Sequence, residues 1–150
     1  MKDSYNKGFT LIEMLVVVAV IGLLSSVILT ALGPAKDKAK DSRIIQEVNQ
    51  VRDLAETYYN GNYNTLPNLP SITDISDANL KALSDDITVQ GGALSIIKSP
   101  APAKMYAAFS SLNSQLGTAD NPQVQYYCID SGGHSVTTLT EPSSYTCPTN

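Results

Sequence analysis

Histidine and cysteine, two residue types that often carry catalysis, are scarce in this sequence of 150 residues. The chain has one histidine, His134, and two cysteines, Cys128 and Cys147. A Ser-His-Asp arrangement would have to use His134, and the sequence has no nucleophile elbow to present the serine. The cysteines and the histidine also lack the spacing of a zinc site. We therefore expect a protein that is not an enzyme and that holds neither a metal ion nor a cofactor.

Acidic residues do not follow a calcium-binding pattern either. An EF-hand loop places its oxygen ligands at fixed positions, which the aspartates of the middle of the chain do not match. We expect these side chains to be solvated surface charge, with a loop calcium site as the alternative. The aspartates concerned are Asp74, Asp77, Asp85 and Asp86.

Positive charge is in short supply. The chain has 10 lysines and arginines against 14 aspartates and glutamates, which gives a formal net charge of −4. Proteins that bind nucleic acid usually carry a basic patch or stripe. The acidic balance therefore predicts no nucleic-acid partner.

Charge is nearly absent from Phe9 to Leu32. As a helix, these 24 residues would measure about 36 Å, enough to cross a hydrocarbon core of about 30 Å. A cleaved secretory signal has a shorter apolar core of about 7–15 residues, so we expect a membrane-spanning segment. Its one charge is Glu13, and a carboxylate inside such a segment indicates a function and a partner.

Flanking charge and cysteine content give opposite indications of orientation. Four basic residues closely follow the apolar run and two precede it, and this count favours a cytoplasmic C-terminal side. Long downstream domains, however, cross the membrane largely regardless of charge. Cys128 and Cys147 are also a candidate disulfide, which requires an oxidising compartment. We expect export, with two free cytoplasmic thiols as the alternative.

The stretch GFTLIEMLVVVAVIGLL, residues 8–24, resembles the prepilin signature of type IV pilins and type II secretion pseudopilins. The resemblance implies that a membrane peptidase, the prepilin peptidase, cuts between Gly8 and Phe9. Phe9 then becomes an N-methylated N-terminus, and Glu13 becomes the fifth residue of the mature chain. Glu13 would meet the positive amine of a neighbouring copy during assembly.

The same resemblance divides the chain into three parts. Residues 1–8 are the leader, 9–34 the hydrophobic transmembrane and assembly helix, and 35–150 an amphipathic helix with a globular pilin head. Loss of the leader removes two lysines and one aspartate, so the formal charge moves from −4 to −5.

Apolar residues recur at spacings of three and four after Pro34, which predicts an amphipathic helix. Pro34 would either begin this helix or kink a continuous one, and Gly61 would supply its left-handed cap. One helix over residues 9–60 is therefore expected. Its apolar face would comprise Ile44, Ile45, Val48, Val51, Leu54, Ala55, Tyr58 and Tyr59, and its i,i+4 ion pairs would be Arg43–Glu47 and Arg52–Glu56.

The remaining sequence predicts a small antiparallel sheet of three or four strands packed on that helix. A short helix over 77–83 with Ser76 as its N-cap comes first, after a turn-rich segment similar to one in many pseudopilins. Strands are expected at 93–97, 105–112, 124–129 and 135–139, with turns bounding 124–129 on both sides. The fold class is α+β, and the resemblance implies the pilin-like lollipop.

By resemblance, the chain is a structural subunit of a type IV pilus that serves adhesion, motility or attachment. Its partners would be further copies in a filament, the prepilin peptidase, and an inner-membrane assembly platform with its ATPase. It would lie in the inner membrane before assembly and in an extracellular pilus, or a periplasmic pseudopilus, afterwards. The alternatives are a type II secretion pseudopilin, a DNA-uptake pilin and a membrane-anchored domain that never polymerises. The loop Ile129–Thr146 lies between the two cysteines. It would be either a contact surface for partners or only a segment closed by a stabilising disulfide.

Overall fold

The computed structural model describes residues 8–69, 77–118 and 121–149. The chain divides into an N-terminal unit that ends at Lys36 and a second unit that begins at Asp37. The elements are α1 (Leu11–Thr57), α2 (Ala78–Val89), β1 (Leu94–Lys98), β2 (Tyr106–Thr118), β3 (Asn121–Asp130) and β4 (Ser135–Thr138).

Helix α1 is continuous over 47 residues, and Pro34 lies inside it rather than at the start of a new helix. The helix ends at Thr57, three residues before the predicted end. Its last turn tightens, because Tyr58 N donates to Ala55 O at 3.1 Å and so closes an i to i−3 bond. Gly61 has a φ of 93°, as predicted, but it serves the turn that follows and not the helix cap.

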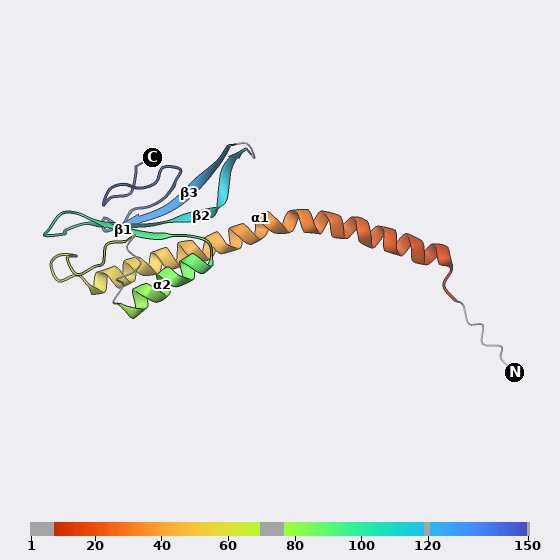
Figure 1. Cartoon of the computed structure of the whole chain (residues 1–150), viewed down its shortest axis with the longest axis horizontal. Coiled ribbons are helices and arrows are strands. Elements are labelled where there is room, and N and C mark those ends of the chain that lie inside the picture. The colour runs from red at the N-terminus through yellow and green to blue at the C-terminus, as the bar shows by residue number, and fades with distance from the viewer. Residues whose placement is uncertain (1–7, 70–76, 119–120, 150) are drawn as a thin grey trace. The chain divides into compact units, whose positions relative to one another are not determined.

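The amphipathic part of α1 supplies one wall of the core in the second unit. Ile44, Val48, Val51 and Ala55 are each 0% exposed, and their spacing is the predicted helical stripe. They pack with sheet residues and with residues of α2 in one cluster, and Figure 1 shows α2 running beside this part of α1. Tyr59, which the pattern placed on the same face, remains 50% exposed.

The sheet has four antiparallel strands in the order β1-β2-β3-β4, which confirms the prediction. The expected turn before β3 is wrong: Asn121 and Pro122 belong to the strand and pair with Thr118 and Gly117. The β2–β3 hairpin is longer than the alternating pattern indicates, because the pairing resumes after an irregularity between Ser111 and Gln115.

Helix α2 begins later and ends later than predicted. Its N-cap is Asp77, whose side chain accepts a hydrogen bond from Leu80 N at 2.7 Å. Ser76, the predicted cap, lies outside the described residues. The helix extends to Val89 because Leu80 and Ile87 are both buried at 0% exposure and continue one apolar face into the core.

A second and smaller cluster forms on the other face of the sheet. Residues alternate between the two faces along a strand, so Phe109 and Cys128, which are register partners, point away from α1. They pack with Ala107 and with Cys147 from the C-terminal segment. The disulfide therefore joins β3 to the C-terminal segment on the face of the sheet that points away from α1.

Candidate functional site

The predicted cleavage site lies in an exposed, non-helical stretch. Residues 8–10 have no regular secondary structure and are exposed, and helix α1 begins directly afterwards. The Phe9 side chain is 79% exposed. An accessible, non-helical backbone is compatible with cleavage by a peptidase at the predicted bond between Gly8 and Phe9.

Helix α1 begins with a capping box formed by Thr10 and Glu13. Thr10 N and Thr10 Oγ1 each donate to Glu13 Oε2 at 2.8 Å, and Glu13 N donates back to Thr10 Oγ1 at 3.3 Å. The box satisfies backbone donors that a helix start otherwise leaves unpaired. The Thr-x-x-Glu spacing is the sequence signature of this motif, so the box could have been predicted from the sequence.

The capping box uses only one oxygen of the Glu13 carboxylate. Both bonds from Thr10 end on Oε2, and among the described residues Oε1 accepts no hydrogen bond. Glu13 is also the only charged residue between Phe9 and Leu32. The geometry therefore places a single carboxylate at the start of an otherwise uncharged segment.

An exposed apolar surface follows this carboxylate. Every residue from Gly8 to Lys36 is exposed, and large side chains such as Leu11 and Leu23 are 84% and 72% exposed. Contiguous apolar surface of this extent marks an interaction site for protein or membrane. By length and composition, α1 is long and apolar enough to cross a membrane, so it is compatible with membrane anchoring.

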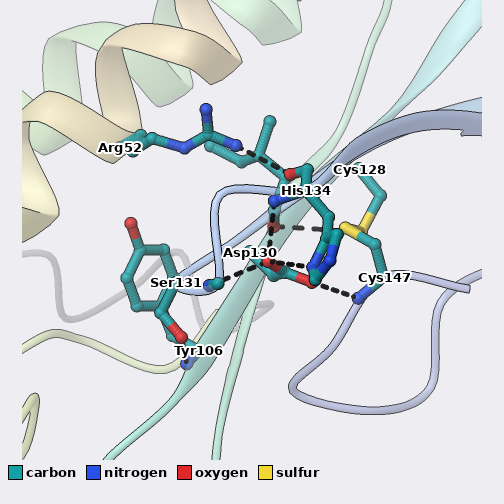
Figure 2. A network of polar contacts seen from close by, with 9 residues as sticks. Arg52, Tyr106, Cys128, Asp130, Ser131, His134 and Cys147 are labelled. Atoms are coloured by element: carbon teal, nitrogen blue, oxygen red, sulfur yellow. Dashed lines mark hydrogen bonds and ion pairs between the residues drawn. A yellow bond between two sulfur atoms is a disulfide. The ribbon is translucent and has the colours of Figure 1, made fainter.

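The second candidate site surrounds the disulfide (Figure 2). Cys128 and Cys147 are bonded, with their Cα atoms 5.8 Å apart. Asp130 lies two positions after Cys128 and is only 2% exposed. Its Oδ1 accepts from Gly132 N at 2.9 Å and from His134 N at 3.1 Å, while its Oδ2 accepts from Cys147 N at 3.1 Å.

His134 completes this network. Its Nδ1 lies 3.1 Å from both oxygens of Asp130, while its side chain is 73% exposed. Burial raises the pKa of the Asp130 carboxyl, but the hydrogen bonds from Cys147, His134 and Gly132 outweigh burial and hold that pKa below its ordinary value.

One of the two predicted helix ion pairs is wrong. Arg52 Nη2 donates to His134 O at 2.7 Å, and Glu56 accepts from Tyr63 at 3.0 Å; among the described residues these two partners replace the Arg52–Glu56 pair. The other pair forms only weakly, because Arg43 Nε lies 3.9 Å from Glu47.

Arg43 instead binds α2, a long-range contact that helix spacing cannot predict. Its Nε and Nη2 donate to the two carboxylate oxygens of Asp86 at 2.7 and 3.0 Å. This bidentate geometry is the usual one for an arginine and a carboxylate. It ties α1 to α2 within the second unit.

The aspartates considered as a calcium site have other partners where the structure describes them. Asp77 caps α2, Asp85 accepts from Lys81 at 2.6 Å, and Asp86 binds Arg43. Asp74 lies outside the described residues. Within the described part of the chain, no group of three or more His, Cys, Asp or Glu side chains could hold a metal ion.

The fold and the first site together define a class of protein. A long N-terminal helix, whose first part is apolar and exposed, continues into a small α+β unit with a four-stranded antiparallel sheet. This is the pilin-like α+β class.

Comparison with known proteins agrees with that class over the N-terminal part of the chain. Residues 3–29 match the prokaryotic N-terminal methylation motif. The chain is 39% identical over 54 residues to the type IV major fimbrial protein FimA of Dichelobacter nodosus, covering 36% of this chain and 35% of that protein. It is 30% identical over 58 residues to the type II secretion system core protein G of Klebsiella michiganensis, covering 39% of this chain and 41% of that protein.

These matches support the type IV pilin and pseudopilin family, as the resemblance predicted. The matched segment spans about a third of the length of the fimbrial protein. No solved structure matches the chain.

Proposed function

We propose that this chain is a structural subunit of a type IV pilus. In this proposal the prepilin peptidase removes residues 1–8 by cutting between Gly8 and Phe9, and Phe9 is then N-methylated. Residues 9–34 act as the assembly helix, and residues 35–150 form the remainder of the subunit. The observation that carries the proposal is the fully exposed apolar start of α1, which contains one capped carboxylate.

Assembly would use the free oxygen of Glu13. Cleavage creates a positive amine at Phe9, and the amine of one subunit would bind Glu13 Oε1 of its neighbour while Thr10 keeps Oε2. Pairing offsets part of the cost of burying either charge, without necessarily exceeding what an apolar replacement would provide. Its larger value is register, because one polar contact in an apolar helix interface fixes how the helices align.

The same proposal assigns compartments and partners. The chain would be held in the inner membrane by the apolar part of α1 and then passed by an assembly platform and its ATPase into an extracellular filament. The disulfide between Cys128 and Cys147 supports export, because such bonds persist in oxidising compartments. The role is structural, with no catalysis by the chain.

Replacing Glu13 by Gln separates charge from helix capping. Gln also completes a capping box, so Glu13→Gln keeps the start of α1 but removes the negative charge. We expect cleavage and membrane insertion as in the wild type and a loss of sheared filaments of more than about tenfold. The matched control is Glu141→Gln, which removes an exposed carboxylate of the head and should leave filament yield unchanged.

The readouts are filament yield and the intact mass of the chain. A processed chain starts at Phe9. If it is N-methylated once, its mass exceeds that of the unmethylated chain by one methylene group. If the Glu13→Gln chain forms normal filaments, the charge pairing is not needed for assembly, and the role of Glu13 is only to cap the helix. A wild-type chain that still starts at Met1 would reject processing and, with it, the filament proposal.

A type II secretion pseudopilin is the second candidate. The match to protein G supports it, as does the Tyr58–Gly61 segment, which is similar to segments of that group. A deletion strain distinguishes the two functions. Loss of surface filaments with normal secretion indicates a pilus, whereas retention of secreted enzymes inside the cell indicates a pseudopilus.

A further inference from the structure

A buried carboxylate lies beside the disulfide and is not explained by filament assembly. Asp130 and Cys128 are two positions apart on β3, so their side chains point to the same face of the sheet. Their register partners on β2 are Ala107 and Phe109, which belong to the same cluster as both cysteines. Asp130 therefore faces the space in which Cys147 is held (Figure 2).

The contact between Asp130 and Cys147 does not involve the sulfur atoms. Cys147 N donates to Asp130 Oδ2 at 3.1 Å in a buried setting. The bond involves the backbone of Cys147, so it is available whether the sulfur is a thiol or part of a disulfide. Hydrogen bonds to a charged acceptor are about twice as strong as those between neutral groups.

We propose that Asp130 is a positioning residue for disulfide formation: it holds the backbone of Cys147 beside Cys128 before the sulfurs are joined. The other backbone hydrogen bonds to Asp130 orient its carboxylate for this role. Gly132 N and His134 N hold Oδ1 and thereby orient the carboxylate. Oδ2 is then directed at the segment that carries Cys147.

The closing step needs a disulfide as oxidant, and glutathione disulfide is a sufficient one. The thiolate of Cys128 attacks it, forming a mixed disulfide and releasing one glutathione thiolate. The thiolate of Cys147 then attacks the Cys128 sulfur of that mixed disulfide, forming the Cys128–Cys147 bond and releasing the second glutathione thiolate. Both leaving thiolates take up the protons lost by the two cysteines. The protein is oxidised by two electrons, and the glutathione disulfide is reduced to two thiols.

An amide cannot replace this carboxylate. Asn at position 130 would have one acceptor oxygen and one NH₂ group. Its oxygen would face either the N–H groups of Gly132 and His134 or that of Cys147. In each case the NH₂ group would face an N–H donor on the other side. Asp130→Asn therefore changes few atoms but removes the hold on Cys147 or on the turn that orients the side chain.

The test is the equilibrium between reduced and oxidised protein in glutathione buffers, with the full chain in detergent micelles. Near-ultraviolet circular dichroism verifies that the reduced chain is folded. We expect Asp130→Asn to lower the effective concentration of the two thiols by about tenfold or more. The matched control is Asp41→Asn, which alters another buried carboxylate bonded to backbone N–H groups but distant in the sequence from the disulfide. It should change the effective concentration less than about twofold.

Equal losses in the two variants would overturn the proposal, because they would show general destabilisation of the fold. An unchanged value in Asp130→Asn would overturn it as well. If Asp130→Asn does not fold, the proposal is tested instead by hydrogen exchange in a Cys128→Ser chain. We expect the amide of Cys147 to remain protected from hydrogen exchange in that chain, although no disulfide can form. Free exchange of this amide would show that only the covalent bond holds the segment.

Discussion

The two parts of α1 obey the same helical geometry but differ in what covers them. From Leu11 to Leu32 every side chain is exposed, and Leu23 remains 72% exposed. In the second part, Val48 and Val51 are 0% exposed because α2 and the sheet pack on one stripe. Burial within the chain therefore supports only the second part, while the first requires a lipid or protein partner to cover it.

Glu13 in the first part of α1 and Asp41 in the second part also differ in whether their partners are local or distant in the sequence. Glu13 bonds to Thr10, three residues away, and closes the start of its own helix. Asp41 is 6% exposed and accepts from Asn113 N and Ser114 N, more than 70 positions along the chain. The Glu13 carboxylate completes local structure through one oxygen, whereas the Asp41 carboxylate fastens the helix to β2.

The largest expected effect follows from core burial. Ile44→Ala removes a fully buried side chain, so it should lower the unfolding free energy of the second unit by about 2–5 kcal/mol. Leu23→Ala makes a comparable change in the exposed part, and it should change that free energy by less than about 0.5 kcal/mol. Urea unfolding of both variants in detergent micelles measures the difference. Similar losses would contradict the division of α1 into two independent parts.

Asp41 should give a smaller effect that depends on pH. Burial raises the pKa of its carboxyl, but hydrogen bonds from Ser114 and Asn113 outweigh burial and lower it below its ordinary value. The folded-state pKa is therefore below the unfolded one. Stability from this group is present above the unfolded pKa and is lost as pH falls through the folded pKa.

At neutral pH, Asp41→Asn should cost about 1–3 kcal/mol, because buried N–H groups lose a charged acceptor. Once the pH falls below the folded-state pKa of Asp41, wild type and variant should converge, since protonation has removed the same contact. Urea unfolding at a series of pH values tests this. A constant difference between the two chains over that range would show that the charge of Asp41 is not what stabilises the fold.

Local patterns in the sequence predicted most of the fold. The stripe that contains Ile44, Val48 and Val51 located the amphipathic part of α1, because helical spacing depends only on near neighbours. Alternation and turn residues located the strands and predicted an antiparallel sheet of three or four of them, but not their order. The strand ends were less predictable: Asn121 and Pro122 resemble a turn, yet pairing with β2 draws them into β3.

Contacts between distant residues could not be predicted in this way. Nothing near Asp130 in the sequence indicates that Cys147 N will donate to it, since a buried carboxylate is recognised only once the chain is folded. The pairing of Arg43 with Asp86 is likewise a contact between residues far apart in the sequence. The Thr10–Glu13 box is different, because its spacing is a local signal that was present in the sequence.

The smallest expected effect concerns that box. Thr10→Ala removes the hydroxyl but keeps Glu13, so the first turn of α1 should fray. The amides of Glu13 and Met14 donate to Thr10 Oγ1 and Thr10 O. Their exchange should become roughly fivefold faster, since loss of such a cap costs about 1 kcal/mol. Hydrogen exchange in micelles measures the change, and Thr10→Ser should restore most of the protection. Because the box makes only local bonds, urea unfolding of the second unit should be unaffected. A fall in that unfolding free energy would show that the exposed part of α1 supports the head, which would break the distinction between its two parts.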